Sequence, residues 1–330
     1  MEQIDSQPRP QTIVIDRKER RIPRMLLLLL GGSIFANMTM CARTVAPGIG
    51  GLDERYVAGS SGLADPEIAI VEIKGAIVDS EVEYVLKQIR QAREDTQVKA
   101  VVLRVDSPGG TVGGSDQIWR ELETLRTRGK PVIASFGGMA ASGGYYVSAN
   151  TDLIVAEPTT LTGSIGVKLE LLQVSDLMKK VGVSSESITT GAFKDTGSMY
   201  RPMTEEERSR WKVVIDDAYN RFLRIVAQGR KLPLKDARAL ADGKVYTAKE
   251  ALDAKLIDRI GYLDDAIALV QTKAGLVSAR IIRYAKPMSL SDAISSLGAS
   301  SSAGGAGLRV DISFDSLLKL RGPQLLFMLD

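Results

Sequence analysis

The stretch Ala100-Val-Val-Leu-Arg-Val105, followed by the turn Asp106-Ser-Pro-Gly-Gly110, says most about how this chain folds. Its first half is a short apolar run of the kind that forms a buried strand, and the proline and glycines of its second half end that strand. Ile118, Leu122 and Leu125 then follow at helical spacing. The segment therefore predicts one β-α unit, in which a glycine turn leads from a buried strand into a helix.

The same alternation continues on both sides of this unit. Residues 67–74 are a strand-like run followed by a helical pattern, and residues 131–135 and 153–156 are two further short strands. Strands that alternate with helices predict parallel pairing with right-handed crossovers, and hence an α/β fold. A long helix follows Thr204, which forms a capping-box pattern with Glu207. The residues that this helix is predicted to bury are Trp211, Val214, Ile215, Ala218, Phe222 and Ile225.

A basic cluster precedes an apolar run near the N-terminus. Residues 1–24 are polar and end in several arginines and lysines, and residues 25–42 begin with a methionine and five leucines. A run of about 18 residues is near the lower limit for a helix that crosses a bilayer, so it predicts a transmembrane anchor or a cleaved signal sequence. By the positive-inside rule we expect a single-pass protein of the inner or plasma membrane, with a cytoplasmic N-terminus and the rest of the chain extracytoplasmic.

Two segments of simple composition divide the remaining chain. Residues 43–66 are rich in Gly, Ser, Ala and Pro and predict a linker, and residues 286–307 predict a second, flexible linker. Between them, residues 67–285 carry the β-α pattern and are expected to form one domain. Residues 308–330 are a tail that contains the apolar run 325–329.

The composition excludes several kinds of hydrolytic site. The chain has no histidine and one cysteine, Cys41, which lies in the N-terminal apolar run. A Ser-His-Asp triad, a Cys-His pair and zinc sites built on imidazole are therefore excluded. The net charge is only +3 and no basic stripe with aromatic residues occurs, so we expect no nucleic-acid binding. Hydrolytic chemistry would have to come from Ser, Thr, Lys, Tyr or carboxylate groups.

Two glycine-rich segments follow predicted strands. The first, 106–110, is compatible with an oxyanion hole or a phosphate loop, because glycines let the backbone approach a ligand and N–H groups at a helix start favour negative charge. No Gly-Lys-Ser/Thr pattern of a phosphate loop follows it, and a plain strand-to-helix turn is the alternative. The second, 137–146, surrounds Ser142 with small residues and would direct the N–H of Gly143 toward a carbonyl group at that serine. The alternative is that Ser142 caps the N-terminus of a helix.

A nucleophilic serine needs a base, and in a chain without histidine the best candidate is a lysine. Lysine is protonated near neutral pH unless burial in an apolar site lowers its pKa, by up to roughly 3–5 units. Lys194 follows a strand-like segment and has small and aromatic neighbours, whereas most other lysines lie among charges. The alternative for Lys194 is an ordinary surface position.

Four segments together resemble the signal peptide peptidase A family over roughly residues 65–285. They are Asp106-Ser-Pro-Gly-Gly110, Ala141-Ser-Gly-Gly-Tyr-Tyr146, Leu161-Thr-Gly-Ser-Ile-Gly166 and Gly191-Ala-Phe-Lys-Asp195, in the family's order. The resemblance implies a fold like that of Clp protease and the crotonases, a spiral of β-α units.

The resemblance also implies a role for each site residue. Ser142 would be the nucleophile, Lys194 the general base, and Ser164 the serine that orients the lysine. Gly109 or Gly110, with Gly143, would supply the oxyanion N–H donors, and no metal or other cofactor is expected. Tyr145 and Tyr146 would be wall residues of the site or simply part of the core.

The family's activity is that of a serine endopeptidase that degrades residual signal peptides and short unfolded peptides. Short relatives form ring-like homo-oligomers in which neighbouring subunits share each site, so we expect Ser142 and Lys194 to lie far apart within one chain. The run 325–329 resembles apolar tails that dock in the substrate groove. This resemblance suggests self-inhibition or a strand added at a subunit edge, and a disordered tail is the alternative.

Three other functions are compatible with the same fold. An acyl-CoA hydratase or isomerase also uses paired glycine N–H groups, but it would not explain Lys194 or the Ser142 segment. A second possibility is a scaffold protein of the peptidase fold without activity. The third is a Ser/Lys peptidase that acts on a specific membrane scaffold protein, which only substrate profiling would distinguish.

Overall fold

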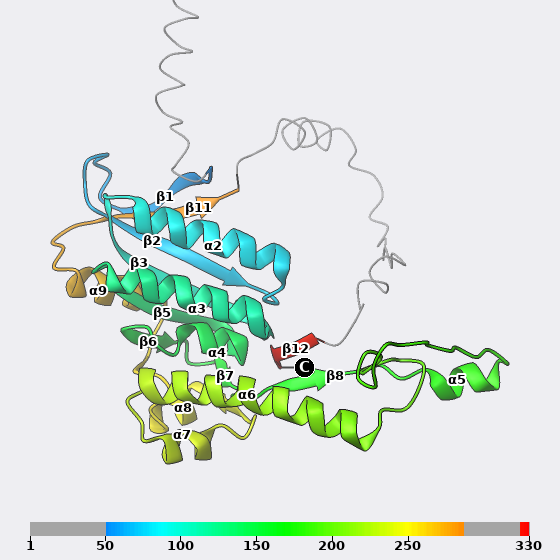
Figure 1. The fold of residues 1–330 in the computed structure, drawn as a ribbon. Helices are drawn as coiled ribbons and strands as arrows, with labels where there is room; N and C mark the ends of the chain where they lie inside the picture. The colour runs from blue at the N-terminus through cyan, green and yellow to red at the C-terminus, as the bar shows by residue number, and fades with distance from the viewer. Residues whose placement is uncertain (1–50, 287–323, 330) are drawn as a thin grey trace, which may run out of the picture. The chain divides into compact units, whose positions relative to one another are not determined.

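The computed structural model describes residues 51–286 and 324–329, all of which belong to one unit, Pro47–Asp330 (Figure 1). The predicted membrane segment 25–42, the basic residues before it and nearly all of the predicted linker 286–307 lie outside the described residues. Within the described ranges, no helix combines the length and the apolar character that a bilayer crossing requires.

A largely parallel sheet forms the centre of the structure. Its strands follow the order β1-β11-β2-β3-β5-β6-β10, and pairing is parallel from β11 to β10 and antiparallel between β1 and β11. Two short strands, β7 and β9, extend it beyond the end of β5. The α/β fold is therefore confirmed. The bounds are β1 Asp53–Gly59, β2 Glu67–Lys74, β3 Val98–Ser107, β5 Val132–Ala141, β6 Leu153–Ala156, β7 Leu161–Gly163, β9 Val245–Thr247, β10 Arg259–Ile260 and β11 Arg280–Ala285.

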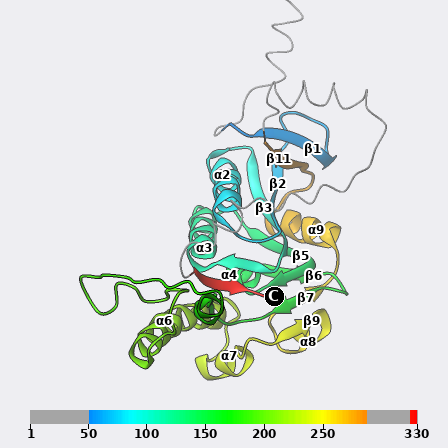
Figure 2. The ribbon, with the colours of Figure 1, turned by 90° about the vertical axis from the view of Figure 1, so that its right-hand side faces the viewer.

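Helices cover both faces of this sheet, as Figure 2 shows. Helices α2 (Asp79–Glu94) and α3 (Val112–Thr127) lie on one side and α9 (Leu263–Lys273) on the other. Successive residues of a strand point to opposite faces, so Ala69 and Val71 of β2 belong to the core under α2, while Ile68 and Ile70 belong to the core under α9. Burial on both faces explains why the central strands are mainly apolar rather than alternating between apolar and polar residues.

The strand predictions hold for the central strands and are wrong at one edge. Strands β2 and β6 have the predicted bounds, and β5 continues through the glycines that were expected to follow it. The linker predicted over residues 43–66 contains β1, which pairs antiparallel with β11. Most of the side chains of β1 are exposed, so its sequence lacks the apolar pattern of a core strand.

The long helix α6 (Glu205–Gly229) begins with the predicted capping box between Thr204 and Glu207. Its second half is buried as expected at Ala218, Phe222 and Ile225. Its first half is not, because Trp211, Val214 and Ile215 are only partly buried there. Figure 1 shows the first turns of α6 extending past the sheet. Two short helices follow it, α7 (Leu234–Leu240) and α8 (Ala248–Asp253).

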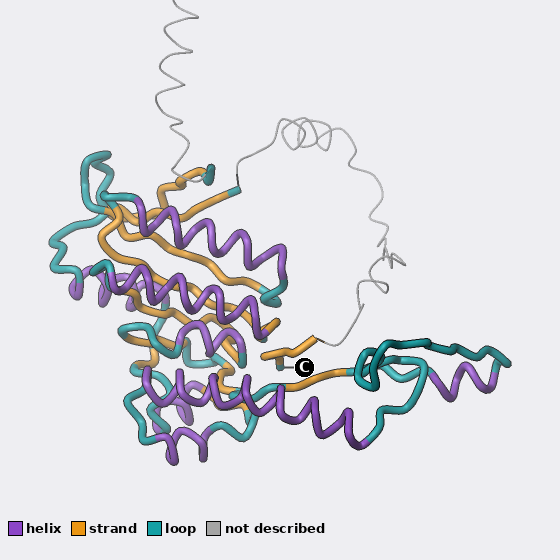
Figure 3. The backbone as a smooth tube through the Cα atoms, in the orientation of Figure 1, coloured by secondary structure: helices purple, strands orange, loops and turns teal. Residues whose placement is uncertain are grey.

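Residues 168–203 project from the sheet as an arm. The arm contains β8 (Lys168–Glu170), α5 (Ser175–Lys180) and a long loop, which Figure 3 shows as the largest loop segment drawn in teal. The strand-like segment predicted before Lys194 is part of this loop and pairs with no described strand. Without a neighbouring strand, its backbone has no partners with which to form a ladder.

Candidate active site

Ser142 lies in a strained turn between β5 and α4 (Gly143–Ser148). Its φ angle is 50° and its ψ angle −111°, and its side chain is 1% exposed. Ser142 occupies the cap position of α4, but its side chain makes no capping hydrogen bond. A non-glycine residue at positive φ costs of order 1–3 kcal/mol, which the surrounding structure must offset. A capping role therefore does not account for Ser142.

The second predicted serine, Ser164, lies beside Ser142. The N–H of Ser142 donates to the carbonyl of Gly163 at 2.8 Å, which ties the strained turn to the end of β7. Ser164 also has a positive φ of 48°, and its N–H donates to the carbonyl of Lys244 at 2.8 Å. Of the four non-glycine residues with positive φ in the described ranges, two are these predicted site serines.

The carbonyl oxygen of Phe327 lies beside Gly109 and Gly143, and Phe327 pairs with Gly110 in the strand register. A Cβ atom added to Gly109 would lie 2.0 Å from this oxygen, and one added to Gly143 would lie 3.1 Å from both the oxygen and the nitrogen of Gly110. The N–H of Gly109 donates to Ser107 Oγ at 3.1 Å, so it is already engaged. This leaves the N–H groups of Gly110 and Gly143 as the candidate donors to a carbonyl oxygen at this position.

The Phe327 carbonyl belongs to the end of the chain itself. Residues Gln324–Met328 form β12, which pairs antiparallel with β4 (Gly109–Thr111) on one side and with β8 on the other. The apolar tail is therefore an ordered strand at this site, which excludes the disordered alternative for these residues. Figure 1 shows β12 between the main sheet and the arm.

An aromatic pocket holds the Phe327 side chain, which is fully buried. Its ring stacks on Tyr146 with a centroid distance of 4.8 Å and lies 4.8 Å from the ring of Phe222. The Tyr146 hydroxyl donates to Asp116 at 2.6 Å, and burial followed by this hydrogen bond raises the pKa of Tyr146. Tyr145 instead donates to the Leu256 carbonyl in the core, so only Tyr146 forms part of the site wall.

Lys194 lies in the loop of the arm and is exposed. Its side chain makes no hydrogen bond or ion pair with the described residues, and the arm extends away from the body that contains α4 (Figure 1). The structure brings Ser142, Ser164, Gly109, Gly110 and Gly143 together and leaves Lys194 outside this group.

An arginine holds the loop that contains Lys194 against α6. Arg201 donates to Asp195 at 2.9 Å and to Glu207 at 2.5 Å. The Arg201 guanidinium and the Thr204 backbone lower the pKa of Glu207 to about 2. The position of Lys194 within the arm therefore depends on this network.

Sequence reasoning missed three contributors to the site. Asp116 orients Tyr146 and pairs with Arg221, and Phe222 lines the aromatic pocket although its spacing predicted only a core residue. Ser115 is fully buried, and its Oγ, which has no hydrogen-bond partner among the described residues, lies 2.6 Å from a Cβ added to Gly143. No motif identifies these residues, because only the fold brings them to the pocket formed by Gly109, Gly110 and Gly143, here called the glycine pocket.

No cluster of metal-ligating side chains occurs near Ser142 within the described ranges. Among these residues, the one group of three that qualifies is Glu54, Glu67 and Asp95, on β1, on β2 and at the end of α2. The chemistry available at the candidate site is that of a buried serine hydroxyl beside two backbone N–H groups.

Comparison with known proteins gives relatives that are named as proteases or peptidases. Protease 4 of Salmonella typhi is 41% identical over 208 residues, which cover 61% of this chain and 34% of that protein. A putative protease of Synechocystis sp. is 40% identical over 210 residues, covering 64% of this chain and 75% of the relative. A putative signal peptide peptidase SppA of Enterococcus faecium is 36% identical over 234 residues, 68% of each chain. The chain thus spans about a third of Protease 4 but most of the shorter relatives.

The family model for peptidase family S49 matches residues 124–277, which contain Ser142, Ser164 and the arm. The shorter relatives are related to this chain over most of their own length, at an identity that rules out chance similarity. On these grounds the chain belongs to peptidase family S49.

Proposed function

We propose that this chain is a serine endopeptidase that cleaves extended peptides with Ser142 as nucleophile and Lys194 as general base. The observation that carries the proposal is β12, an extended segment held between β4 and β8. Its Phe327 carbonyl stands for the carbonyl of a substrate peptide bond at the glycine pocket next to Ser142. The peptidase names of the relatives agree with this reading.

The reaction would be an acyl transfer. Neutral Lys194 takes the proton of the Ser142 hydroxyl while the oxygen attacks the carbonyl carbon, and the N–H groups of Gly110 and Gly143 stabilise the oxyanion. Lys194 then gives the proton to the leaving amine as the C–N bond breaks. Water hydrolyses the ester that remains on Ser142, and the Ser164 hydroxyl orients the lysine throughout.

The lysine would come from a neighbouring subunit of a ring-like homo-oligomer. A lysine acts as a general base only where burial favours its neutral form, and Lys194 is exposed in the single chain. The arm also carries many exposed apolar side chains, as an interface does before it assembles. They are Leu172, Leu177, Val181, Val183, Ile188, Phe193 and Tyr200.

The substrates would be residual signal peptides and other short unfolded chains. A strand inserted between β4 and β8 must be extended, and the pocket of Tyr146 and Phe222 favours apolar side chains. The apolar segment 25–42 would anchor the protein in the inner or plasma membrane, with the peptidase domain extracytoplasmic. The sheet would be the first part of a spiral of β-α units like that of Clp protease and the crotonases.

The test is hydrolysis of a fluorogenic signal-peptide-like substrate by the full chain and by Ser142→Ala and Lys194→Ala. Each substitution should abolish turnover, whereas Lys180→Ala, a change of an exposed lysine in the same arm, should not. A mixture of the two inactive variants should regain activity after subunit exchange. Activity that survives Ser142→Ala would refute the nucleophile, and an inactive parent would favour the scaffold function.

A further inference from the structure

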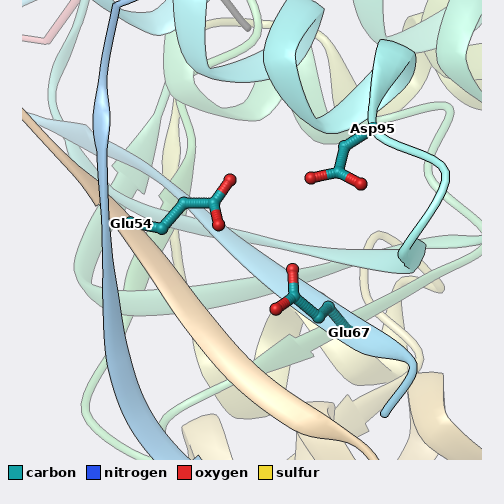
Figure 4. A group of neighbouring side chains, drawn as sticks. All are labelled: Glu54, Glu67 and Asp95. Carbon is teal, nitrogen blue, oxygen red and sulfur yellow. The ribbon is translucent and has the colours of Figure 1, made fainter. Parts of the chain in front are cut away.

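Three carboxylates converge at one end of the sheet, away from the serine site. Glu54 lies on β1, Glu67 is the first residue of β2 and Asp95 is the C-cap of α2. One carboxylate oxygen of each lies within 4.8 Å of the others. Figure 4 shows the three side chains directed into the same space between the strands and the helix end.

The strand register places a buried tyrosine on the same side of the sheet. Glu54 is directly opposite Tyr284 in the antiparallel pair β1–β11, so both side chains leave the same face. Tyr284 is 2% exposed and belongs to the core that α2 covers. Its hydroxyl has no hydrogen-bond partner among the described residues, although a buried hydroxyl normally has one.

Gln91 on α2 is a second buried polar group at the same place. Its Nε2 donates to Glu54 at 3.2 Å and to the Leu52 carbonyl at 3.4 Å. Gln91 is 2% exposed, and its Oε1 has no partner in the described part of the chain. Two buried oxygens without partners, one from β11 and one from α2, therefore accompany the carboxylates and point to a ligand not supplied by these residues.

The charges at this cluster do not balance. Arg280 forms an ion pair with Glu67 at 2.8 Å, and Lys130 donates to the backbone carbonyls of Ala92 and Asp95. The Glu54 carboxylate forms no ion pair with a described residue. The three carboxylates, whose oxygens lie within 4.8 Å of one another, repel each other when ionised. A bound cation would relieve this repulsion.

We propose that Glu54, Glu67 and Asp95 bind one calcium ion, with the Tyr284 hydroxyl and the Gln91 amide oxygen as neighbouring oxygen donors. All of these groups are hard oxygen donors, which calcium and magnesium prefer over softer metals. Two oxygens on one calcium ion can lie up to about 5 Å apart, twice the usual calcium–oxygen distance. Around magnesium the corresponding limit is about 4.2 Å. A separation of up to 4.8 Å therefore fits calcium with less rearrangement.

The ion would add a connection for the edge strand β1. Strand β1 lies at the edge of the sheet, and among the described strands it pairs with β11 alone. A calcium ion between Glu54, Glu67 and Asp95 would link β1 directly to β2 and to the end of α2. Calcium sites of extracellular modules bind in the range of about 10⁻⁴–10⁻³ M, and we expect this partly exposed site to fall there.

Terbium luminescence tests the site in the full-length protein. Terbium replaces calcium and emits when a nearby tyrosine is excited, so Tyr284 should sensitise it. Calcium should displace terbium at a concentration at least about tenfold lower than magnesium. Glu54→Gln and Asp95→Asn should each weaken calcium binding at least about tenfold, because each removes a charged ligand. Asp176→Asn, a change of an exposed carboxylate in the arm, is the matched control and should bind as the parent does.

Thermal unfolding of the same proteins gives a second measurement. At a hundred times its Kd, calcium should raise the Tm of the parent by about 5 °C, and it should not raise that of Glu54→Gln at the same concentration. Tyr284→Phe removes only a hydroxyl without a partner, so it should fold and should lose most of the terbium emission. Equal calcium binding by the parent and the carboxylate variants would overturn the site. Absence of binding by the parent would do the same, and magnesium that competes as well as calcium would overturn the choice of metal.

Discussion

Phe327 is the residue whose replacement best tests whether β12 competes with substrate for the position between β4 and β8. Its ring is fully buried against Tyr146 and Phe222, with both centroid distances at 4.8 Å. Replacing a buried phenylalanine with alanine typically costs about 3–5 kcal/mol. For Phe327 we use the lower value, about 3 kcal/mol, as the free energy that the substitution costs, because the end of a chain can leave its pocket. That value corresponds to a factor of roughly one hundred in the equilibrium between bound and free tail.

The assay is steady-state hydrolysis of a fluorogenic peptide by the parent and by Phe327→Ala. If the tail competes with substrate, freeing it lowers the apparent KM by up to about a hundredfold, until the substrate's own affinity becomes limiting, and leaves kcat unchanged. Leu325→Ala is the matched control, because Leu325 is only partly buried. Its effect on KM should be less than about fivefold.

An unchanged KM in a folded Phe327→Ala protein would refute this reasoning. Deletion of residues 308–330 provides a second check, since it removes β12 entirely. If the deletion alters neither turnover nor assembly, the tail has no inhibitory role. A loss of kcat in both variants would instead indicate that β12 is part of the working site.

Three further predictions concern the glycine pocket and the arm. Gly143→Ala places a methyl group in the pocket that receives the carbonyl, so kcat/KM should fall at least about a hundredfold. Gly113→Ala is the control: a Cβ there meets nothing within 4 Å, so kcat/KM should be unchanged. Arg201→Ala frees the loop that contains Lys194, so kcat should fall and the loop should be cleaved faster by an added protease. Arg208→Ala is the control: it removes an exposed ion pair and should change neither kcat nor the rate of loop cleavage. The pKa of Glu207 is about 2 when folded against 4.5 for the free group, so its stabilisation is complete above pH 4.5 and lost as pH falls toward 2. The Tm difference between the parent and Glu207→Gln should therefore be constant above pH 5 and shrink below it, and a difference that grows with acid would contradict the assignment.

The main sheet was largely predictable because its strands can be recognised from short local stretches of sequence. Buried parallel strands are mainly apolar, and β2 and β6 have their predicted bounds. The capping box of Thr204 and Glu207 fixes the start of α6 within four residues of sequence. The candidate glycines and serines lie in short segments at the ends of strands, and such turns can be recognised from a few neighbouring residues.

What the sequence did not predict depends on contacts between distant segments. Most side chains of strand β1 are exposed, and its pairing with the distant β11 is what makes it a strand. The cluster of Glu54, Glu67 and Asp95 comes from three separate elements, and no spacing in the sequence connects them. Lys194 was expected after a strand, but its segment has no neighbouring strand in the single chain.

The three-stranded sheet β4-β12-β8 has a consequence for how substrates would be chosen. The middle strand, β12, is the one whose place a substrate would take, and it pairs with β4 along one edge and with β8 along the other. A polypeptide can take this position only when about five consecutive residues have given up all of their own backbone hydrogen bonds. For a folded protein, the cleavage rate would then follow the population of locally opened chains, and each 1.4 kcal/mol of local stability would slow it about tenfold. On the proposed function, the position between β4 and β8 accepts only locally unfolded chains. Its selectivity would then depend more on the conformation of a chain than on its sequence.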